Sequence, residues 1–246
     1  MSSYNTFARF YDELTENVEY QKRSEYIEQF FESGDKDVKT VLDLACGTCS
    51  VSLPLAEKGY RVIGVDASEN MLEIASEKLA QSECDFTLLK ADMRDFDLGE
   101  KVDAAVCSLD GINHLNSISD VKRCFDSVYA ALKNGSLFVF DVNTVYKHNE
   151  ILSDNTFVFD EDDYYLVWDN EQLDNRSVRI LIDVFIYNGE SYDRESEEFT
   201  ETAYTVDELK NILKESGFSS VCVYDELTLN EPKDDSQRLY FVCKKD

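Results

Sequence analysis

The sequence predicts an α/β fold: a doubly wound, mostly parallel seven-stranded sheet with a C-terminal antiparallel hairpin and a small antiparallel β insertion. Strand-like apolar runs alternate with amphipathic helical segments as far as residue 142, a pattern typical of βαβ units with parallel strands. Between about 156 and 203 several strand-like segments follow one another without a helix. The last two strand-like segments, at about 219–227 and 237–243, are separated by a polar loop alone, which predicts a hairpin.

Helices and strands are expected to alternate through the first half of the chain. Aromatic and aliphatic residues at three- and four-residue spacing predict helix from about residue 4 to 33, with Tyr4 on it. Ser68 is placed to cap one helix, and Asn134-Gly135 is expected to end another. The expected strands are 41–45, 61–66, 85–90, 102–108 and 136–142, and the expected helices between them are 50–58, 69–80 and the segment that follows Ser119.

The segment 146–203 is expected to be an insertion in a domain made of residues 1–145 and 204–246. Within it, one face of the strand expected over 178–187 is apolar throughout, and the other is mixed enough to line a pocket. We therefore expect the insertion to lie over the ligand-binding cleft as a lid or substrate platform. The sheet pattern resumes after Thr205, which opens a helix with a capping box completed by Glu208.

The bulk composition indicates a globular, cytoplasmic protein. The 246 residues include 43% hydrophobic side chains, which suits one domain with an insertion or two small domains. No apolar run reaches about 18 residues, so we expect no membrane span, and the N-terminus lacks the pattern of a secretory signal. The seven scattered cysteines are expected to be free thiols in a reducing cytoplasm, with those at 107, 124, 222 and 243 buried.

The formal net charge of −27 bears on the choice of partner. So negative a surface repels phosphate backbones at long range. A nucleic-acid partner is therefore not expected, although a local basic groove could survive, and a small-molecule substrate is favoured. The sequence does not define the oligomeric state.

A strand–turn–helix segment over 41–50 carries the strongest functional signal. Gly47 lies in the turn after the strand, where a residue without a side chain lets the backbone approach a ligand. Asp66 ends the next strand 19 residues later and is placed to accept hydrogen bonds from both hydroxyls of a ribose. Together the two features predict a ribose-bearing cofactor across the ends of two parallel strands.

The details of the turn decide between cofactors. A dinucleotide fingerprint has three glycines, which let the backbone meet a pyrophosphate. Ala45, Gly47 and Ser50 stand at the corresponding positions, so a nicotinamide-dependent oxidoreductase is left as an alternative. Cys46 and Cys49 form a C-x-x-C, but no second pair accompanies them, and neither a redox site nor a metal site is expected.

Three segments, 43–48, 65–72 and 91–96, resemble the signatures of class I S-adenosylmethionine (SAM)-dependent methyltransferases. The resemblance spans most of the chain. It implies that the turn with Ala45 and Gly47 holds the methionine part of SAM, with Asp43 close by. The chain departs from the family at Cys49, where a small residue, most often Gly, is usual, and the added side chain is expected to lie near the methionine end and lower the affinity for the cofactor.

The same resemblance implies roles around the rest of the cofactor. Asp66 is expected to bind the ribose hydroxyls with Ala67 beside it, and Met71 to pack on the adenine. Asp92 is expected to accept a hydrogen bond from the adenine amino group, while the backbone amide of Met93 meets the ring.

Two groups are candidates for the methyl-acceptor end of the site. Leu109 and His114 follow the fourth strand of the sheet, where ligands bind in open parallel sheets. We expect Leu109 to contact the cofactor. His114 is a candidate to accept the proton of an amine or hydroxyl nucleophile; the alternative, which the sequence alone favours, is a His114 that caps or hydrogen-bonds the following helix start. Tyr11 is expected to reach SAM or the acceptor from a helix that covers the cofactor, with simple aromatic packing as its alternative.

The resulting prediction is SAM-dependent methyl transfer to a small-molecule acceptor, with an amine nitrogen favoured. The signatures are similar to those of glycine N-methyltransferase and of nucleotide-linked amino-sugar N-methyltransferases. A non-catalytic SAM-binding protein is a further alternative. Outside the signatures, His148 is expected at the surface, and Arg238 is expected to pair with Asp234 or Asp235 or to bind an anionic substrate.

Overall fold

The computed structural model describes residues 11–12, 15, 18–34, 36–162 and 164–246. The start of the expected N-terminal helix, with Tyr4, lies outside these residues. The first helix with described bounds is α2 (Tyr20–Glu32), which buries Ile27 and Phe31 against the rest of the protein.

Seven strands form the main sheet: β1 (Thr40–Leu44), β2 (Arg61–Asp66), β3 (Phe86–Lys90), β4 (Val102–Cys107), β5 (Leu132–Asn143), β10 (Ser220–Asp225) and β11 (Arg238–Lys244). Their order across the sheet is β10-β11-β5-β4-β1-β2-β3. All pairs among β1 to β5 are parallel, whereas β11 runs antiparallel to both of its neighbours. The predicted mostly parallel sheet with an antiparallel C-terminal hairpin is confirmed.

Two helices begin where their capping residues predict. Helix α4 (Glu69–Leu79) follows Ser68, whose hydroxyl accepts a hydrogen bond from a first-turn amide at 3.3 Å. Helix α6 (Val206–Glu215) opens with the capping box of Thr205 and Glu208.

Helix α5 (Ile118–Ala131) ends earlier than the sequence predicts. Asn134-Gly135 does not stop it, because the chain has already entered β5 at Leu132. The amide of Gly135 donates to the carbonyl of Lys245 at 2.6 Å, just beyond the end of β11. Backbone pairing with a segment far away in sequence therefore overrides the local turn signal.

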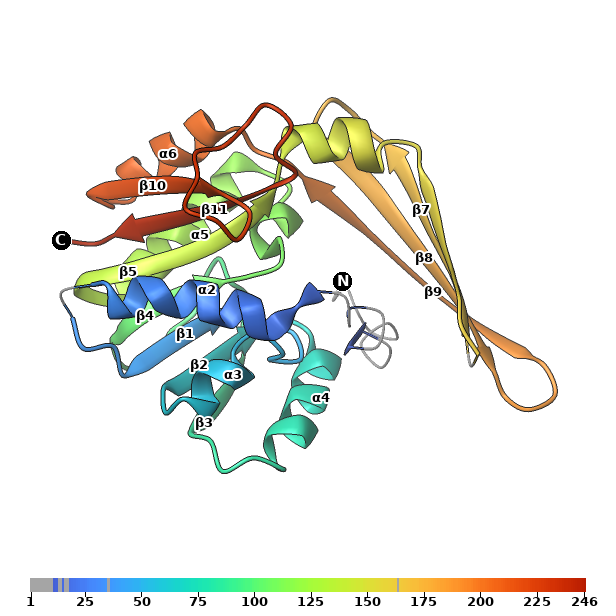
Figure 1. Cartoon of the computed structure of the whole chain (residues 1–246), viewed down its shortest axis with the longest axis horizontal. Helices are drawn as coiled ribbons and strands as arrows, with labels where there is room; N and C mark the ends of the chain where they lie inside the picture. The colour runs from blue at the N-terminus through green and yellow to red at the C-terminus, as the bar shows by residue number, and fades with distance from the viewer. Residues whose placement is uncertain (1–10, 13–14, 16–17, 35, 163) are drawn as a thin grey trace.

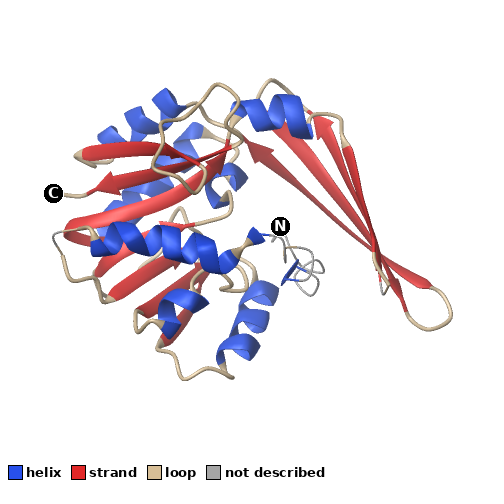
Figure 2. Ribbon diagram, in the orientation of Figure 1, coloured by secondary structure: helices blue, strands red, loops and turns tan. Residues whose placement is uncertain are grey.

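Helices cover both faces of the main sheet, which is thus doubly wound (Figures 1 and 2). Helices α2, α4 and α3 (Leu53–Glu57, shorter than predicted) lie on one face, and α5 and α6 lie on the other. Phe31 and Leu55 accordingly belong to one core cluster, and Phe125 and Leu213 to the other. The loops at the carboxyl ends of the parallel strands are left to form a site.

A second sheet contains four antiparallel strands: β6 (Thr156–Asp160), β7 (Tyr164–Gln172), β8 (Ser177–Tyr187) and β9 (Tyr192–Thr202). Figure 1 shows it as a long arm that extends from the main body, joined to β5 by the short helix η3 (Lys147–Leu152). Val178, Ile180, Ile182 and Val184 of β8 are buried, so the predicted apolar face is confirmed. The predicted antiparallel β insertion is therefore present.

Two predictions about the surface have mixed outcomes. The cysteines are all free, and Cys107, Cys124 and Cys243 are buried as predicted. Cys222 is exposed instead, because it lies on β10 at the edge of the main sheet. Among the described helices, none is long and apolar enough to cross a membrane.

Candidate active site

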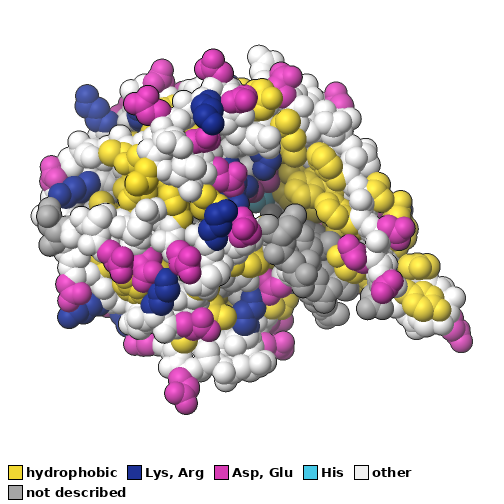
Figure 3. Space-filling model, viewed as in Figure 1, with side chains coloured by type: hydrophobic (Ala, Val, Ile, Leu, Met, Phe, Trp, Pro, Cys, Tyr) yellow, Lys and Arg dark blue, Asp and Glu magenta, His cyan; other side chains and the backbone are white. Residues whose placement is uncertain are grey.

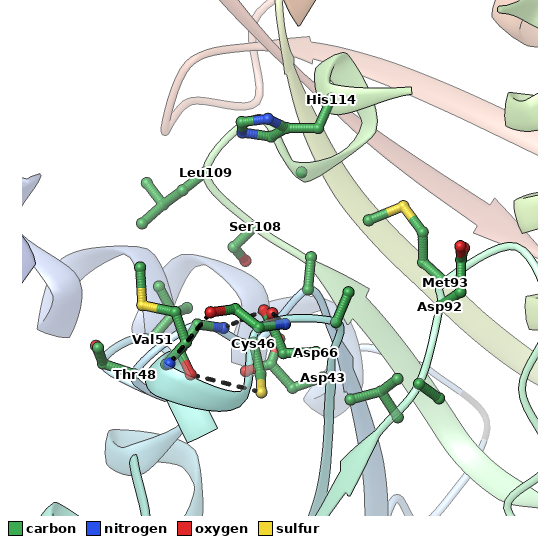
Figure 4. Close-up of a pocket in the computed structure, with 18 of the residues that line it drawn as sticks. Asp43, Cys46, Thr48, Val51, Asp66, Asp92, Met93, Ser108, Leu109 and His114 are labelled. Carbon is green, nitrogen blue, oxygen red and sulfur yellow. Dashed lines mark hydrogen bonds between the residues drawn. The ribbon is translucent and has the colours of Figure 1, made fainter. Parts of the chain in front are cut away.

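A cavity of about 530 Å³ opens at the carboxyl ends of β1 to β4. Strand β1 has parallel neighbours on both sides, so the cavity lies where the direction of chain winding reverses. In Figure 4, Asp43 and Asp66 lie on one side of this space and His114 on the other. The structure brings the whole predicted set of site residues to this cavity, which is lined by Tyr11, Asp43, Ala45, Gly47, Asp66, Ala67, Met71, Asp92, Met93, Leu109 and His114.

The turn after β1 follows the sharp path that its sequence predicts. Gly47 has a φ of +53°, and a Cβ atom at this position meets nothing within 4 Å; the backbone conformation, not crowding, favours glycine here. Ala45 and Cys49 also have positive φ, of 55° and 62°, which is strained for residues with a side chain.

The side chain of Cys49 does not lie where the resemblance places it. It is fully buried in a cluster with Cys46 and Ala75, and it is not among the residues that line the cavity. The positive φ of Cys49 directs its thiol towards α4. The expected position of this side chain beside a ligand in the turn is therefore wrong, whereas its expected effect on the affinity for the cofactor stays a prediction.

Asp66 joins the turn after β1 to the turn after β2. One carboxylate oxygen accepts from the amide of Gly47 at 2.9 Å, and the other accepts from the amide of Ser68 at 2.8 Å. Burial raises the pKa of Asp66, although these amide hydrogen bonds oppose the rise. Each oxygen has a second lone pair, so the carboxylate can still accept two hydrogen bonds from a ligand.

Asp43 is a buried acid with an unmet hydrogen-bonding need. Its side chain is 2% exposed, and its Oδ2 has no hydrogen-bond partner. Burial raises the pKa of Asp43 to about 7, and the neighbouring Asp66 adds to the rise. A ligand that offers a positively charged donor at this point would stabilise the carboxylate.

The opposite wall, after β3, combines a carboxylate with apolar surface. Asp92 pairs with Arg94, with Nη2 to Oδ2 at 2.5 Å and Nε to Oδ1 at 2.9 Å. This hydrogen bonding from Arg94 lowers the pKa of Asp92. Arg94 also lines the cavity, although its sequence pattern did not identify it. The thioether side chains of Met71 and Met93 supply the apolar surface on the same side.

The loop after β4 is held in an unusual conformation by a buried arginine. Leu109 and Asp110 both have φ of 56°, in the left-handed region. Arg238 donates from Nη2 to Asp110 at 2.5 Å and from Nη1 to Asp141 at 2.6 Å. The expectation that Arg238 pairs with Asp234 or Asp235, or binds an anionic substrate, is wrong, because the side chain is buried within this network.

His114 ends the short helix η2 (Gly111–His114), directly after this loop. Its ring packs at 5.2 Å from that of Phe199 on β9, and it lines the cavity. The start of α5 is capped by Ser117, whose hydroxyl accepts from the amide of Asp120 at 3.1 Å. Ser117, not His114, is therefore the N-cap of α5.

The N-terminal segment is tied to the turn after β1 by Asp12. Its carboxylate accepts from Thr48 at 2.6 Å and from Ser50 at 2.8 Å, and it forms an ion pair with Lys78 at 2.5 Å. Sequence reasoning missed this network; the two hydroxyl residues beside Gly47 were its only local signal.

Tyr11, next to Asp12, connects the cavity to the arm. Its ring lines the cavity and packs against the apolar cluster of the second sheet, which includes Leu166 and Ile182. Burial raises the pKa of Tyr11 well above its usual value, so its phenol stays protonated at neutral pH. Aromatic packing and a position at the site are thus both realised in this residue.

His148 is fully buried, so its expected place at the surface is wrong. Its Nδ1 lies 2.7 Å from the carbonyl of Arg176, and its Nε2 lies 3.4 Å from a carboxylate oxygen of Glu201.

Asp110, His114 and Glu201 each offer one potential ligand atom, and these atoms lie within 4.8 Å of one another. Sequence reasoning missed Glu201, whose position beside His114 arises only in the folded chain.

The chain is similar to methyltransferases along its whole length. Residues 41–135 match the family model described as a methyltransferase domain. The putative methyltransferase YqeM of Bacillus subtilis is 35% identical, with 98% of this chain and 97% of that protein aligned. The glycine/sarcosine N-methyltransferase of Aphanothece halophytica is 27% identical over 98% of this chain and 88% of its own length.

Solved structures show the same likeness. The crystal structure of an S-adenosylmethionine-dependent methyltransferase from Clostridium acetobutylicum superimposes with a TM-score of 0.90. The two chains are 30% identical, and the match covers 98% of each. Both the main sheet and the arm therefore have counterparts in that protein.

Proposed function

This chain belongs to the S-adenosylmethionine-dependent methyltransferases, and on that premise we propose that it transfers the methyl group to a nitrogen atom of a small amine. SAM is the cofactor of the family, so the nicotinamide alternative is set aside. A purely cofactor-binding protein is likewise set aside, because the relatives are methyltransferases. The acceptor is the part that the proposal adds.

The residues of the cavity fit SAM at its methionine and ribose ends. Asp43 has an unpartnered buried oxygen that suits the ammonium of the methionine part. Asp66 retains lone pairs for the two ribose hydroxyls, with Ala67 beside it. We assign the backbone turn of Ala45 and Gly47 to the methionine part as well.

The opposite wall fits the adenine. Met71 and Met93 offer apolar surface for the ring, and the amide of Met93 is assigned to a ring nitrogen. Asp92 is assigned to the adenine amino group, which would donate to it in place of one of the four hydrogen bonds that Arg94 gives this carboxylate. Leu109 and Tyr11 are assigned to the side of the cofactor that faces the acceptor.

The main task of the protein in this reaction is to align the nucleophile with the methyl carbon and the sulfur of SAM. SAM supplies a methyl group that its sulfonium centre activates for displacement by a nucleophile. The cavity residues would hold SAM, and the loop of Leu109 and His114 lines the side from which the acceptor nitrogen approaches. This arrangement aligns the nitrogen, the methyl carbon and the sulfur. Such orientation lowers the reaction barrier by roughly 7–11 kcal/mol in well-ordered systems. Tyr11, which packs against the apolar cluster of the second sheet, is assigned to shield the same side from water.

The observation that carries the choice of an amine is the position of His114 at the cavity, between the cofactor turn and a pair of carboxylates. An imidazole there can take the proton that an ammonium must lose before its nitrogen becomes nucleophilic. The N-methyltransferase activity in the name of one full-length relative agrees with this choice. The net charge of −27 also favours an acceptor of positive charge over one with phosphates.

The arm completes the proposal. Residues 1–145 and 204–246 are treated as the SAM-binding domain, and 146–203 as the insertion that selects the acceptor. The ring of His114, the proposed proton acceptor, contacts Phe199 on β9 of the insertion. This contact supports the proposal that the insertion selects the acceptor. We also propose a reducing, cytoplasmic setting, in line with the seven free thiols.

Calorimetric titration of the reduced protein with SAM, S-adenosylhomocysteine and NADH tests the cofactor first. Binding of the first two without NADH is expected. Methyl transfer is then measured with sets of primary amines, alcohols and thiols of matched size. Turnover of amines alone supports the proposal, whereas turnover of alcohols or thiols in their place overturns it.

A further inference from the structure

A cluster of charged side chains lies beside the cavity, where the short helix η2 packs against β9. Asp110 precedes η2, His114 ends it and Glu201 projects from β9; their potential ligand atoms lie within 4.8 Å of one another. Figure 3 shows acidic, basic and histidine side chains together in the hollow between the main body and the arm. Since His114 also lines the cavity, this cluster adjoins the space assigned to SAM.

Glu201 is buried and hydrogen-bonded in this cluster. It is 4% exposed, and its Oε2 accepts from the amide group of Asn143 at 3.2 Å. Asn143 is fixed in turn, because its backbone amide donates to Asn113 at 2.9 Å and its side-chain oxygen accepts from Lys147 at 2.9 Å. A carboxylate so constrained is suited to orient a ligand.

An unpartnered nitrogen points at the same carboxylate. His148 is fully buried, and its Nε2 has no hydrogen-bond partner although it lies 3.4 Å from Oε2 of Glu201. A backbone carbonyl oxygen can only accept a hydrogen bond. The Nδ1 of His148 therefore carries a proton and donates a hydrogen bond to the carbonyl of Arg176. The buried Nε2 therefore lies against the carboxylate of Glu201 without a hydrogen bond, and a positive charge close to Glu201 would stabilise this carboxylate.

The fixed charges of the described residues leave room for one such cation. The carboxylates outnumber the arginine and lysine side chains by one in the connected network around the cluster, with His114 and His148 left out of the count. Arg238 is fully engaged by Asp110 and Asp141, so it does not neutralise Glu201. The network consists of Asp110, Asp141, Glu201 and Glu226 against Arg23, Arg238 and Lys147.

We propose that Glu201, Asp110 and His114 form an ammonium subsite that receives the methyl acceptor as a cation. The inference rests on the proposed function and deepens it: the acceptor is an amine of net positive charge, not an amino acid whose carboxylate would meet Glu201 and Asp110. Glu201 and Asp110 attract and orient the ammonium. Glu201 thus determines specificity and His114 acts on the bound nitrogen.

The proton and electron count of the step is complete without a further reactant. The ammonium gives one N–H proton to the imidazole of His114, and the freed lone pair forms the new N–C bond to the methyl carbon. The C–S bond breaks, and its electron pair stays on sulfur. The product leaves as a methylated ammonium, and His114 returns its proton to solvent.

A matched series of four-carbon probes tests the subsite by binding. The protein is first saturated with S-adenosylhomocysteine, and then n-butylamine, 1-butanol and 4-aminobutyrate are titrated in turn while ligand-detected NMR reports their affinities. We expect n-butylamine to bind about 10-fold or more tightly than either of the others, as for a hydrogen-bonded charge. Equal affinity for the amine and the alcohol, or tighter binding of 4-aminobutyrate, overturns the inference.

The variant Glu201→Gln keeps the shape of the side chain and removes its charge. We expect it to lose the preference for n-butylamine over 1-butanol while its affinity for S-adenosylhomocysteine is unchanged. Glu198→Gln, on the same strand but with 58% of its side chain exposed, is the matched control and is expected to keep the preference. If Glu201→Gln does not fold, Asp110→Asn is measured in its place, and a retained preference in the folded variant overturns the inference.

Two further outcomes are distinguishable. Failure to bind S-adenosylhomocysteine, or turnover of alcohols or thiols in place of amines, contradicts the proposed function itself, whereas amine turnover without a charge preference contradicts only the subsite. The same three residues are also a candidate metal site. Stoichiometric binding of Zn²⁺ that displaces n-butylamine and is lost in Glu201→Gln would show a metal centre and overturn the ammonium subsite.

Discussion

The carboxylate of Asp66 accepts a hydrogen bond from the backbone amide of Gly47 at 2.9 Å. The bond fixes the distance between the ends of β1 and β2, the two strands across which SAM is proposed to lie. Because the second oxygen is held by Ser68, the carboxylate has one orientation and presents its remaining lone pairs to the cavity. The residue proposed to bind the ribose thus also shapes the turn proposed to hold the methionine part.

The variant Asp66→Ala is therefore expected to weaken SAM binding strongly. Loss of hydrogen bonds to a charged group costs about 1.5–3 kcal/mol, or roughly 10–100-fold in Kd. Calorimetric titration with SAM measures the change. Asp85→Ala, an exposed acid before the neighbouring strand β3, is the control and is expected to bind SAM normally. An unchanged Kd in Asp66→Ala would remove Asp66 from the ribose site.

Asp43 is expected to make the stability of the ligand-free protein fall as the pH rises. Its pKa is about 7 in the folded protein and about 3.9 in an unfolded chain. Between these values the folded state keeps a proton that the unfolded state has lost, so the stabilisation present below the unfolded pKa is lost as the pH rises through the folded pKa. The contribution is roughly 3–5 kcal/mol.

Urea unfolding at about pH 5 and about pH 8 tests this linkage. Asp43→Asn is neutral at both values, and the difference in unfolding free energy between them is expected to shrink relative to the wild type. Asp85→Asn serves as the control that keeps the wild-type difference. If Asp43→Asn and the wild type show the same pH dependence, Asp43 is not the group responsible.

The sequence predicts features that depend on neighbouring residues, such as turns and strand ends. It does not predict contacts between segments that lie far apart along the chain. Gly47 and Asp66 were identified because turn chemistry and strand ends are readable over about 20 residues. Arg238 and Asp110 lie 128 residues apart, and only the antiparallel pairing of β11 with β5 brings the guanidinium to the loop after β4. No pattern near Arg238 carries that information.

His148 illustrates the same limit from the side of burial. It lies in a polar stretch, which predicts exposure, yet the return of β8 and β9 covers it completely. The short helix η3 places the ring between Arg176 and Glu201, which are separated from it by 28 and 53 residues. The sequence alone therefore does not predict the proposed ammonium subsite, because its residues come together only in the folded protein.

Arg238 is expected to act as a positioning residue for the loop of Leu109 and Asp110. In Arg238→Met, Asp110 and Asp141 lose their buried partner, which costs about 3–5 kcal/mol of stability. The released loop is also expected to raise the Kd for S-adenosylhomocysteine, a change that stability loss alone does not produce in the folded fraction. Denaturant unfolding and calorimetry measure the two effects.

Partial rescue separates charge from geometry at the same position. Arg238→Lys keeps the charge but cannot bond both carboxylates in a fixed fork, so an intermediate Kd is expected. Arg179→Gln, which removes an arginine paired at the surface of β8, is the control and is expected to change neither quantity. Normal ligand affinity in folded Arg238→Met would show that the loop holds its shape without the arginine.

Asp12 is expected to control how long the cofactor stays bound. Its hydrogen bonds from Thr48 and Ser50 and its ion pair with Lys78 fasten Tyr11 over the cavity. Asp12→Ala should therefore speed the release of S-adenosylhomocysteine with little effect on global unfolding, because few core contacts are lost. Stopped-flow displacement measures the off-rate, and Glu19→Ala, an exposed acid before α2, is the control. Equal off-rates in the two variants would separate Asp12 from cofactor retention.

His114→Ala is expected to lower kcat by about 10²–10⁴-fold, the usual contribution of a general base, while some activity remains because alignment persists. The affinity for S-adenosylhomocysteine is expected to change little. Added imidazole should restore part of the rate in His114→Ala, where a space is left beside Phe199, but not in His114→Phe, where the space is filled. Rescue by imidazole distinguishes a proton acceptor from a packing residue. A wild-type kcat in His114→Ala, or a loss of rate that imidazole restores in neither variant, would assign the ring of His114 to packing and leave deprotonation of the acceptor to solvent.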